Sequence, residues 1–259
     1  MKTIFLSFIM AVLGFASAMG QSLVEKAATE YNNDKYPEAL ELYLQAAKAE
    51  GTSSDLYYNI GNTYYRMGDL GHAVLYYERA LVMDPSNDDA ATNLEFVNSK
   101  IQTRISEEKS FVVQVIDTVV ESQTSNSWAT IAAISFVLLV AAILLYAFSS
   151  VIALRKVGFF GGGILIVVTI LSLMCAVSVK SRVEAHDKAV VVSPSVTLST
   201  VPRTPKDKTE EAFILTSGNK VTIVDSVENK TGEAVQVWVE VKADDTHRAW
   251  LKKEHLERI

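Results

Sequence analysis

The chain has few of the residues from which catalytic and metal sites are built. Its 259 residues contain one cysteine, Cys175, and four histidines, His72, His186, His247 and His255. A single cysteine allows no intramolecular disulfide and no cysteine-based metal site. The histidines lack metal-ligand spacing, so each is expected at the surface, and no nucleophile elbow, paired-acid site or phosphate loop is present. We therefore expect no catalytic residues, no metal, no cofactor and no enzymatic activity.

Basic residues are too few for a nucleic-acid-binding protein. The chain carries 24 Lys and Arg against 30 Asp and Glu, which gives a net charge of −6 at pH 7. Binding to phosphates requires a basic face. The composition therefore predicts no nucleic-acid partner.

Charged residues are absent from two apolar runs, 128–154 and 157–179, which only Arg155 and Lys156 separate. About 20 helical residues cross a hydrocarbon core of about 30 Å, and each run is long enough. The pattern predicts two transmembrane helices joined by a turn at these two charges. The alternative is a pair of helices buried in a soluble core. A transmembrane hairpin would leave both flanking segments in one compartment.

The start of the chain has the features of an export signal. A basic start, an apolar run over residues 4–15 and the small residues Ala16-Ser17-Ala18 predict a signal peptide at residues 1–20. Cleavage is expected after Ala18 or Gly20, with an uncleaved anchor as the alternative.

The distribution of basic residues adds a prediction of orientation. No Lys or Arg lies between Lys109 and Arg155, so the positive-inside rule places the turn after the first span in the cytoplasm. Lys180 and Arg182, after the second span, favour the opposite orientation. Together with the signal, the first span predicts a two-pass protein of the inner (cytoplasmic) membrane with both soluble domains in the periplasm.

An internal repeat precedes the apolar runs. Ala39, Tyr43, Ala46 and Gly51 recur 34 residues later as Ala73, Tyr77, Ala80 and Pro85. This pattern resembles the tetratricopeptide repeat, in which small residues lie where two helices touch. The first copy is weaker, because Ala27, Glu30 and Gly51 depart from the signature. We expect a repeat domain over 21–105, with repeats at about 21–52 and 54–87 and a capping helix over 87–105 that begins at Ser86-Asn87-Asp88-Asp89.

The resemblance implies a concave face that binds an extended peptide. Two complete repeats are below the usual minimum of about three, so a partner, an oligomer or the membrane would complete the stack. Lysines of the chaperone-type carboxylate clamp are missing, and the alternative is that the polar residues form a solvated face. The predicted groove residues are Tyr31, Asn32, Tyr58, Asn59, Asn62, Tyr65, Arg66, Asn93 and Phe96.

A connector over 106–127 leads to the first span. Apolar residues recur at spacings of three and four from Phe111 to Val120, which predicts an amphipathic helix. It is expected either at the membrane interface or against the repeat domain or a partner helix; interfacial helices usually carry basic residues, and this one does not.

Glycines open the second span, at Gly158 and Gly161-Gly162-Gly163. They lack the context of a phosphate loop and predict close helix–helix approach. No acid, histidine or arginine lies within either span, so the hairpin is expected to be an anchor or docking element and not a transporter.

Residues 183–259 have the alternating pattern of short strands. β-Branched runs separated by turn residues predict five or six strands and a small all-β barrel. The order of these strands resembles the bacterial SH3 domain. The segments that match are Gly218 to Val224, Trp238 to Val241, Trp250-Leu251 and a closing turn at His255-Leu256, whereas Ala249 stands where the family usually has glycine. Trp238 and Trp250 are the candidate ligand site of the barrel, with core or rim packing as the alternative.

The complete order predicts a multidomain protein with all-α tetratricopeptide repeats, a two-helix transmembrane hairpin and a small all-β SH3-like barrel. This order resembles the BatE-type members of the Bacteroides aerotolerance group. The resemblance implies a membrane scaffold beside von Willebrand A-type Bat proteins, linked to aerotolerance or envelope stress. The alternative is an envelope sensor whose barrel binds peptidoglycan.

Overall fold

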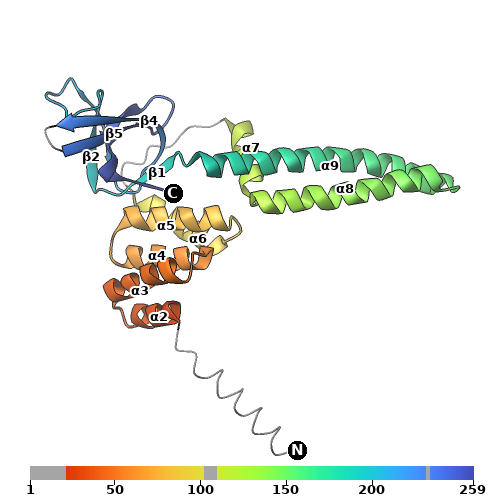
Figure 1. Cartoon of the computed structure of the whole chain (residues 1–259), viewed down its shortest axis with the longest axis horizontal. Helices are drawn as coiled ribbons and strands as arrows, with labels where there is room; N and C mark the ends of the chain where they lie inside the picture. The colour runs from red at the N-terminus through yellow and green to blue at the C-terminus, as the bar shows by residue number, and fades with distance from the viewer. Residues whose placement is uncertain (1–21, 102–109, 232–233) are drawn as a thin grey trace, which may run out of the picture.

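The computed structural model describes residues 22–101, 110–231 and 234–259. Five helices stack at the N-terminal side, two long helices project from one end of this body, and a sheet lies beside both (Figure 1). The predicted signal peptide at residues 1–20 lies outside the described residues.

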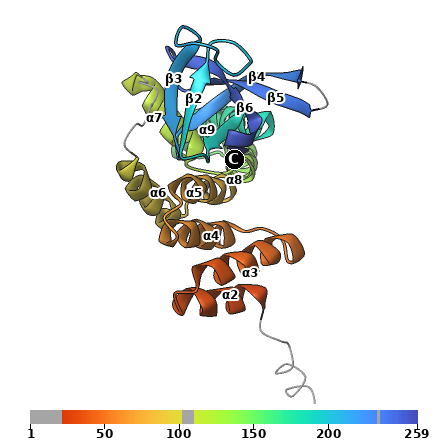
Figure 2. The same ribbon diagram turned by 90° about the vertical axis from the view of Figure 1, so that its left-hand side faces the viewer.

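The N-terminal region is all-α and follows the predicted repeats. Its helices stack one on the next in chain order, as Figure 2 shows from the side. Capping explains several of the boundaries. Ser22 and Glu25 form a capping box, and the side chains of Asp69 and Asn87 accept backbone N–H groups at the starts of their helices. The helices are α2 (Leu23–Asn32), α3 (Tyr36–Ala49), α4 (Ser54–Arg66), α5 (Leu70–Met83) and α6 (Asp88–Lys100).

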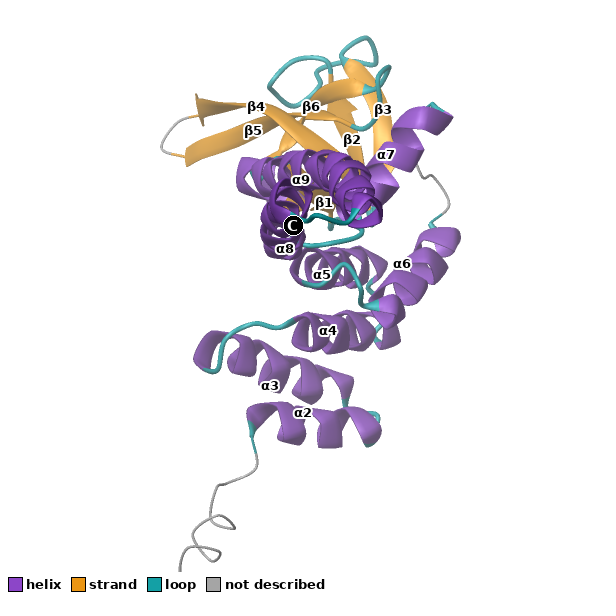
Figure 3. Cartoon of the chain, turned by 90° about the vertical axis from the view of Figure 1, so that its right-hand side faces the viewer, coloured by secondary structure: helices purple, strands orange, loops and turns teal. Residues whose placement is uncertain are grey.

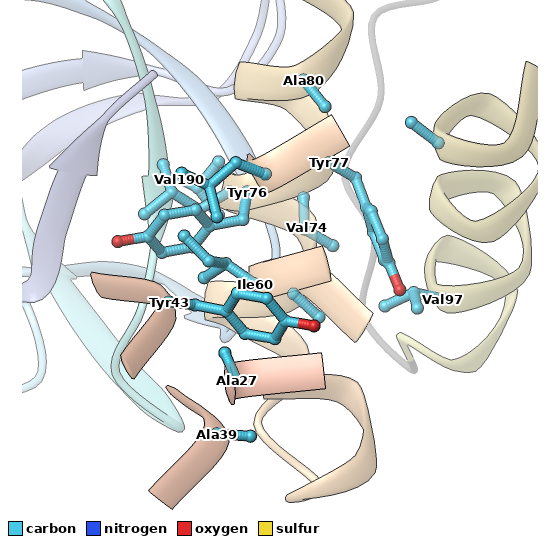
Figure 4. Close-up of a cluster of buried hydrophobic side chains, with 14 of the residues drawn as sticks. Ala27, Ala39, Tyr43, Ile60, Val74, Tyr76, Tyr77, Ala80, Val97 and Val190 are labelled. Atoms are coloured by element: carbon cyan, nitrogen blue, oxygen red, sulfur yellow. The ribbon is translucent and has the colours of Figure 1, made fainter. Parts of the chain in front are cut away.

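The core of the repeats consists of small residues facing large ones. Tyr43 and Tyr77 are buried among alanines from neighbouring helices (Figure 4). A Cβ added at Gly61 would lie 2.8 Å from ring carbons of Tyr77, so α4 and α5 approach this closely only with glycine there. The predicted role of small residues at helix contacts is confirmed at this position.

Two long apolar helices form a hairpin, α8 (Ser125–Phe148) and α9 (Ile152–Ala185). Both are long and apolar enough to cross a membrane, and most of their side chains are exposed rather than buried in a core. The turn predicted at Arg155 and Lys156 is wrong. The helices are separated by residues 149–151, and both cations lie inside α9 because Arg and Lys are good helix formers.

Glycine allows the two hairpin helices to touch at one end. A Cβ at Gly158 would lie 2.7 Å from the carbonyl oxygen of Ala142, and Gly162 is also buried against α8. The predicted close approach is confirmed at these two positions and is wrong for Gly161 and Gly163, whose added Cβ atoms would meet nothing within 4 Å.

A shorter helix, α7 (Phe111–Glu121), lies beside the base of the hairpin (Figure 3). Arg182 of α9 pairs with Asp117 and Glu121 of α7, each at 2.8 Å. The indole nitrogen of Trp128 donates to the carbonyl oxygen of Val120 at 3.0 Å. These bonds fix the polar side of α7 on the hairpin and leave its apolar side, including Phe111 and Ile116, exposed.

The C-terminal region is a seven-stranded antiparallel sheet in the order β3-β2-β6-β5-β4-β1-β7. The sequence predicts five or six strands, and β7 brings the described number to seven; a closing turn is present as the 3-10 helix Lys253–His255. The strands are β1 (Lys188–Val191), β2 (Ser195–Ser199), β3 (Glu211–Thr216), β4 (Lys220–Thr231), β5 (Ala234–Lys242), β6 (Arg248–Lys252) and β7 (Leu256–Arg258).

One face of this sheet makes its core. Val239 and Val241 of β5 and Leu251 of β6 alternate with outward residues, and they pack with Leu198 and Leu215. Together with the helical repeats and the two long apolar helices, this all-β region gives the predicted multidomain fold class.

Candidate partner-binding surfaces

The predicted groove residues lie on three helices, α2, α4 and α6, which are the first helices of successive repeat units. The structure gathers them into three neighbouring clusters rather than one open row of amides. Asn32 is exposed at the end of α2, and Tyr58 lies on α4 with its ring centroid 6.1 Å from that of Tyr77.

Arg66 organises the first cluster. Its guanidinium pairs with Asp34 at 3.0 Å and lies 4.6 Å from the ring centroid of Tyr36 and 5.8 Å from that of Tyr31. Asp34 and Tyr36 are not among the predicted residues, because they lie at the turn between α2 and α3 and outside the first helices to which the groove is assigned. This cluster presents a fixed cation on a flat aromatic base.

Asn62 occupies the centre of the second cluster. Its side-chain oxygen accepts from the Tyr77 hydroxyl at 2.6 Å and from the Asn93 amide at 2.8 Å. Burial raises the pKa of Tyr77 well above the usual range, which keeps its hydroxyl a donor. Asn62 is thus a structural link between α4, α5 and α6.

Aromatic rings form the third cluster, toward the end of the stack. Tyr65 and Phe96 meet edge to face with centroids 5.8 Å apart, and the Phe96 side chain is 50% exposed. The Lys100 ammonium donates to the Tyr65 hydroxyl at 2.6 Å and lies 4.4 Å from the Phe96 ring. Lys100 escaped the sequence prediction because the repeat signature ends before it.

The tryptophans of the sheet share one face. Trp250 is paired with Glu240, two residues from Trp238 on β5, so both indoles lie on the side opposite the core. Trp238 is nevertheless only 4% exposed, and it lines a pocket of about 270 Å³ together with Thr204 and Pro205. Trp238 is therefore buried, whereas Trp250 remains half-buried.

The repeats and the sheet are joined by an interface that the sequence prediction missed. Val190 of β1 is fully buried in the repeat core, beside Tyr76 and Val74 of α5 (Figure 4). A Cβ at Gly71 would lie 3.1 Å from the Val191 carbonyl oxygen, and one at Gly218 would overlap Ile101. The outer side of α5 is therefore covered by the chain's own sheet.

Polar contacts surround this apolar interface. Lys220 pairs with Glu78 at 2.7 Å, and Arg79 donates to the carbonyl oxygen of Arg258 at 2.5 Å and lies 3.7 Å from Glu257. A Lys–Glu pair of this kind contributes up to about 1 kcal/mol. The ring of buried contacts and ion pairs holds the two regions in a defined register.

His72 belongs to the same interface, so its side chain is half-buried and does not lie at the open surface as expected. It lies in the first turn of α5, with Nδ1 2.7 Å from Asp69 and Nε2 3.4 Å from Glu257 of β7. Its ring stacks on Tyr64, and burial raises the pKa of Tyr64 to about 12. The hydrogen bond to the Asp69 carboxylate raises the pKa of His72.

Within residues 22–101, 110–231 and 234–259, no group of three or more His, Cys, Asp or Glu side chains could hold a metal ion. His247, in the loop before β6, is held by Asp244 at 2.8 Å, and the free thiol of Cys175 lies in α9.

The fold defines a multidomain protein of helical repeats, two long apolar helices and an all-β region. Residues 54–87 match the model of the tetratricopeptide repeat family, which covers α4 and α5. No curated protein matches the chain. The chain therefore contains a tetratricopeptide repeat, a module that typically binds other proteins and performs no catalysis.

Proposed function

We propose that this protein is a non-enzymatic scaffold, anchored in a membrane by α8 and α9, that presents two binding modules to partner proteins. The observation that carries the proposal is the division of the repeat surface. The outer side of α5 is covered by the sheet, whereas Arg66 and Phe96, on the first helices of the repeat units, remain exposed. The open side is the one that the repeat family uses for peptides.

The proposed partner site keeps the predicted residues with their roles refined. Rings supply apolar contact, Arg66 supplies a cation, and Asn59 and Asn93 supply amides, while Asn62 holds the surface in shape. A partner segment with acidic and aromatic side chains fits this chemistry. The site comprises Tyr31, Tyr58, Asn59, Asn62, Tyr65, Arg66, Asn93 and Phe96.

We place the protein in the inner membrane with both soluble modules in the periplasm. Contact of α5 with β1, at the end of the hairpin where both regions lie (Figure 1), supports a shared compartment. The domain division that goes with this proposal is a signal peptide at 1–20, repeats at 21–105, a connector at 106–127, spans at 128–154 and 157–179, and an SH3-like domain at 183–259.

The order of these parts supports a BatE-type role in an aerotolerance or envelope-stress complex with von Willebrand A-type Bat proteins. The repeats would hold the partner, and the hairpin would dock it beside other membrane proteins. The net charge of −6 is consistent with protein rather than nucleic-acid partners.

Replacement of Phe96 tests the groove. We expect Phe96→Ala together with Asn59→Ala to lower capture of crosslinked partners from intact membranes about tenfold, the effect of losing one aromatic anchor. Val82→Ala is the control, because Val82 is 45% exposed on α5, in the same repeat as Asn59, but lies outside the groove. Equal capture by all variants would contradict the proposed site.

A second function is an envelope sensor that binds peptidoglycan through the sheet. The pocket of about 270 Å³ beside Trp238, open at its polar rim of Ser195, Thr197 and Lys252, favours this alternative. Full-length protein in detergent should then sediment with purified peptidoglycan, and a Lys252→Ala variant should sediment less. No retention of the wild-type chain would remove the sensor function.

A further inference from the structure

An open cleft of about 910 Å³ lies where α7, the end of α9 and the start of β1 meet. Its walls differ in character. Leu173, Met174 and Val177 of α9 make an apolar floor, and charged residues from all three elements make the rim. Neither the repeat groove nor the tryptophan face of the sheet includes any of these residues.

The apolar floor belongs to the hairpin surface that we propose to face lipid. All three floor side chains are exposed, and they continue the exposed apolar surface of α9. The Ser125 hydroxyl at the start of α8 donates to the carbonyl oxygen of Ala176 at 2.9 Å. The floor therefore lies level with the first turn of α8, where the chain enters the apolar hairpin.

The rim carries charges of both signs. Arg182 is held between Asp117 and Glu121 at 2.8 Å, and the Lys188 ammonium lies 3.8 Å from Glu121. Asp187 adds a third carboxylate. Burial lowers the pKa of Lys188, with Lys220 and Arg182 acting in the same direction. A partly desolvated ammonium with one long carboxylate contact gains from a second anion nearby.

These features identify the chemistry of the occupant. The apolar floor suits acyl chains, Lys188 suits a phosphate, and Glu121 and Asp187 suit an ammonium. Three carboxylates face two cations on the rim, so a headgroup with a net negative charge is disfavoured. A choline headgroup fits less well than a primary ammonium, because it has no N–H to donate to the carboxylates.

We propose that this cleft binds one zwitterionic phospholipid of the ethanolamine type, with its phosphate at Lys188, its ammonium at Glu121 and Asp187, and its chains along Leu173 and Val177. The bound lipid would join α7 to the hairpin and set the depth of the protein in the bilayer. This inference rests on the proposed membrane anchoring.

Native mass spectrometry of the full-length protein, extracted in mild detergent, tests the site. Dioleoyl phosphatidylethanolamine, phosphatidylcholine and phosphatidylglycerol are titrated separately. We expect the first ethanolamine lipid to bind about tenfold more tightly than the others, as one added charge-assisted hydrogen bond would give. Lys188→Gln should weaken its binding about tenfold, and Glu121→Gln should remove the preference over choline.

Lys180→Gln is the matched control, since it removes the same charge from the same end of the hairpin. Lys180 is exposed, pairs with Glu184 at 3.7 Å and does not line the cleft. Equal binding of the three lipids, or equal loss in the Lys188 and Lys180 variants, would overturn the lipid site alone. Recovery of the wild-type chain in the aqueous fraction without detergent would overturn membrane anchoring and the lipid site together.

Discussion

Replacement of Gly71 by alanine should destabilise the protein if the sheet is docked on α5 and stabilise it if the sheet is not. Gly71 lies in the first turn of α5. In a helix whose side at this point faced water, alanine would stabilise the fold by about 0.5–1 kcal/mol relative to glycine. Docking reverses this expectation, because the added Cβ would overlap the Ser217 hydroxyl oxygen and lie 3.1 Å from the Val191 carbonyl oxygen.

Overpacking at this contact sets the size of the effect. The Val191 carbonyl and the Cα of Val192, 3.2 Å from the added atom, belong to the backbone and yield only if the sheet shifts. Such insertions cost about 1–3 kcal/mol, and the helix-propensity gain offsets part of that cost. A net destabilisation of about 1–2 kcal/mol lowers the Tm of a cooperative unit of about 150–250 residues by about 2–8 °C.

Thermal unfolding of the full-length protein in detergent, followed by tryptophan fluorescence of the sheet, measures this shift. Ser217→Ala alone should change Tm little, since its hydroxyl makes only a 3.4 Å hydrogen bond to the Val192 carbonyl. The double variant Gly71→Ala with Ser217→Ala should recover part of the loss, which a double-mutant cycle detects. A rise in Tm for Gly71→Ala would refute the docking of the sheet on α5.

Three further predictions concern single side chains. The pKa of His72 is raised in the folded protein, so His72 stabilises the fold fully below its unfolded pKa of about 6.5 and loses this contribution as pH rises through the folded pKa. The Tm should therefore fall between about pH 6 and 8, and it should fall less in His72→Gln. Asn62→Ala leaves the buried Tyr77 hydroxyl without its acceptor and should cost about 1–3 kcal/mol of unfolding free energy in a denaturant titration, whereas Asn59→Ala should leave stability unchanged. Arg182→Gln removes both ion pairs to α7 and should raise hydrogen exchange over residues 111–121 about tenfold, with no change in Lys180→Gln; unchanged exchange would show that α7 is held by other contacts.

Local patterns predicted the elements well. The 34-residue spacing indicated the helix pairs, and Asn87 followed by acids indicated the start of α6, because capping acts within one turn. Alternating β-branched residues likewise indicated the strands, since each strand buries one face. The identity of the groove as a partner site, its SH3-like companion and the signal peptide stay predictions.

The predicted position of the hairpin turn is wrong because a pair of charged residues does not by itself end a helix. Arg155 and Lys156 continue α9, and the chain breaks at the serines and Val151 before it. Arg155 lies 5.4 Å from the ring centroid of Tyr146 of α8, which lets a cation remain on the helix beside an aromatic partner. The sequence shows that these cations lie at the end of an apolar run, but it does not show where the helix begins.

The interface between repeats and sheet joins residues far apart in the chain, so local periodicity could not predict it. One signal was nevertheless present. Val74, Leu75, Tyr76 and Tyr77 are consecutive and apolar, and a helix that is apolar on all sides has no solvent face. Covering of α5 on both sides could have been predicted from this run, although the identity of the covering strand could not.

The central claim is that the repeats and the sheet dock on one side of a membrane, and a zero-length crosslink in intact membranes tests it most directly. Carbodiimide joins an amine to a carboxylate only at contact distance, and the Lys220 ammonium lies 2.7 Å from the Glu78 carboxylate. We predict a Glu78–Lys220 crosslinked peptide within the monomer that disappears in Glu78→Gln. Arg203→Lys is the positive control, because it places an amine beside the Glu210 carboxylate within the sheet. If this control pair is crosslinked in the membranes and the Glu78–Lys220 peptide is absent, the docked, same-side arrangement is contradicted.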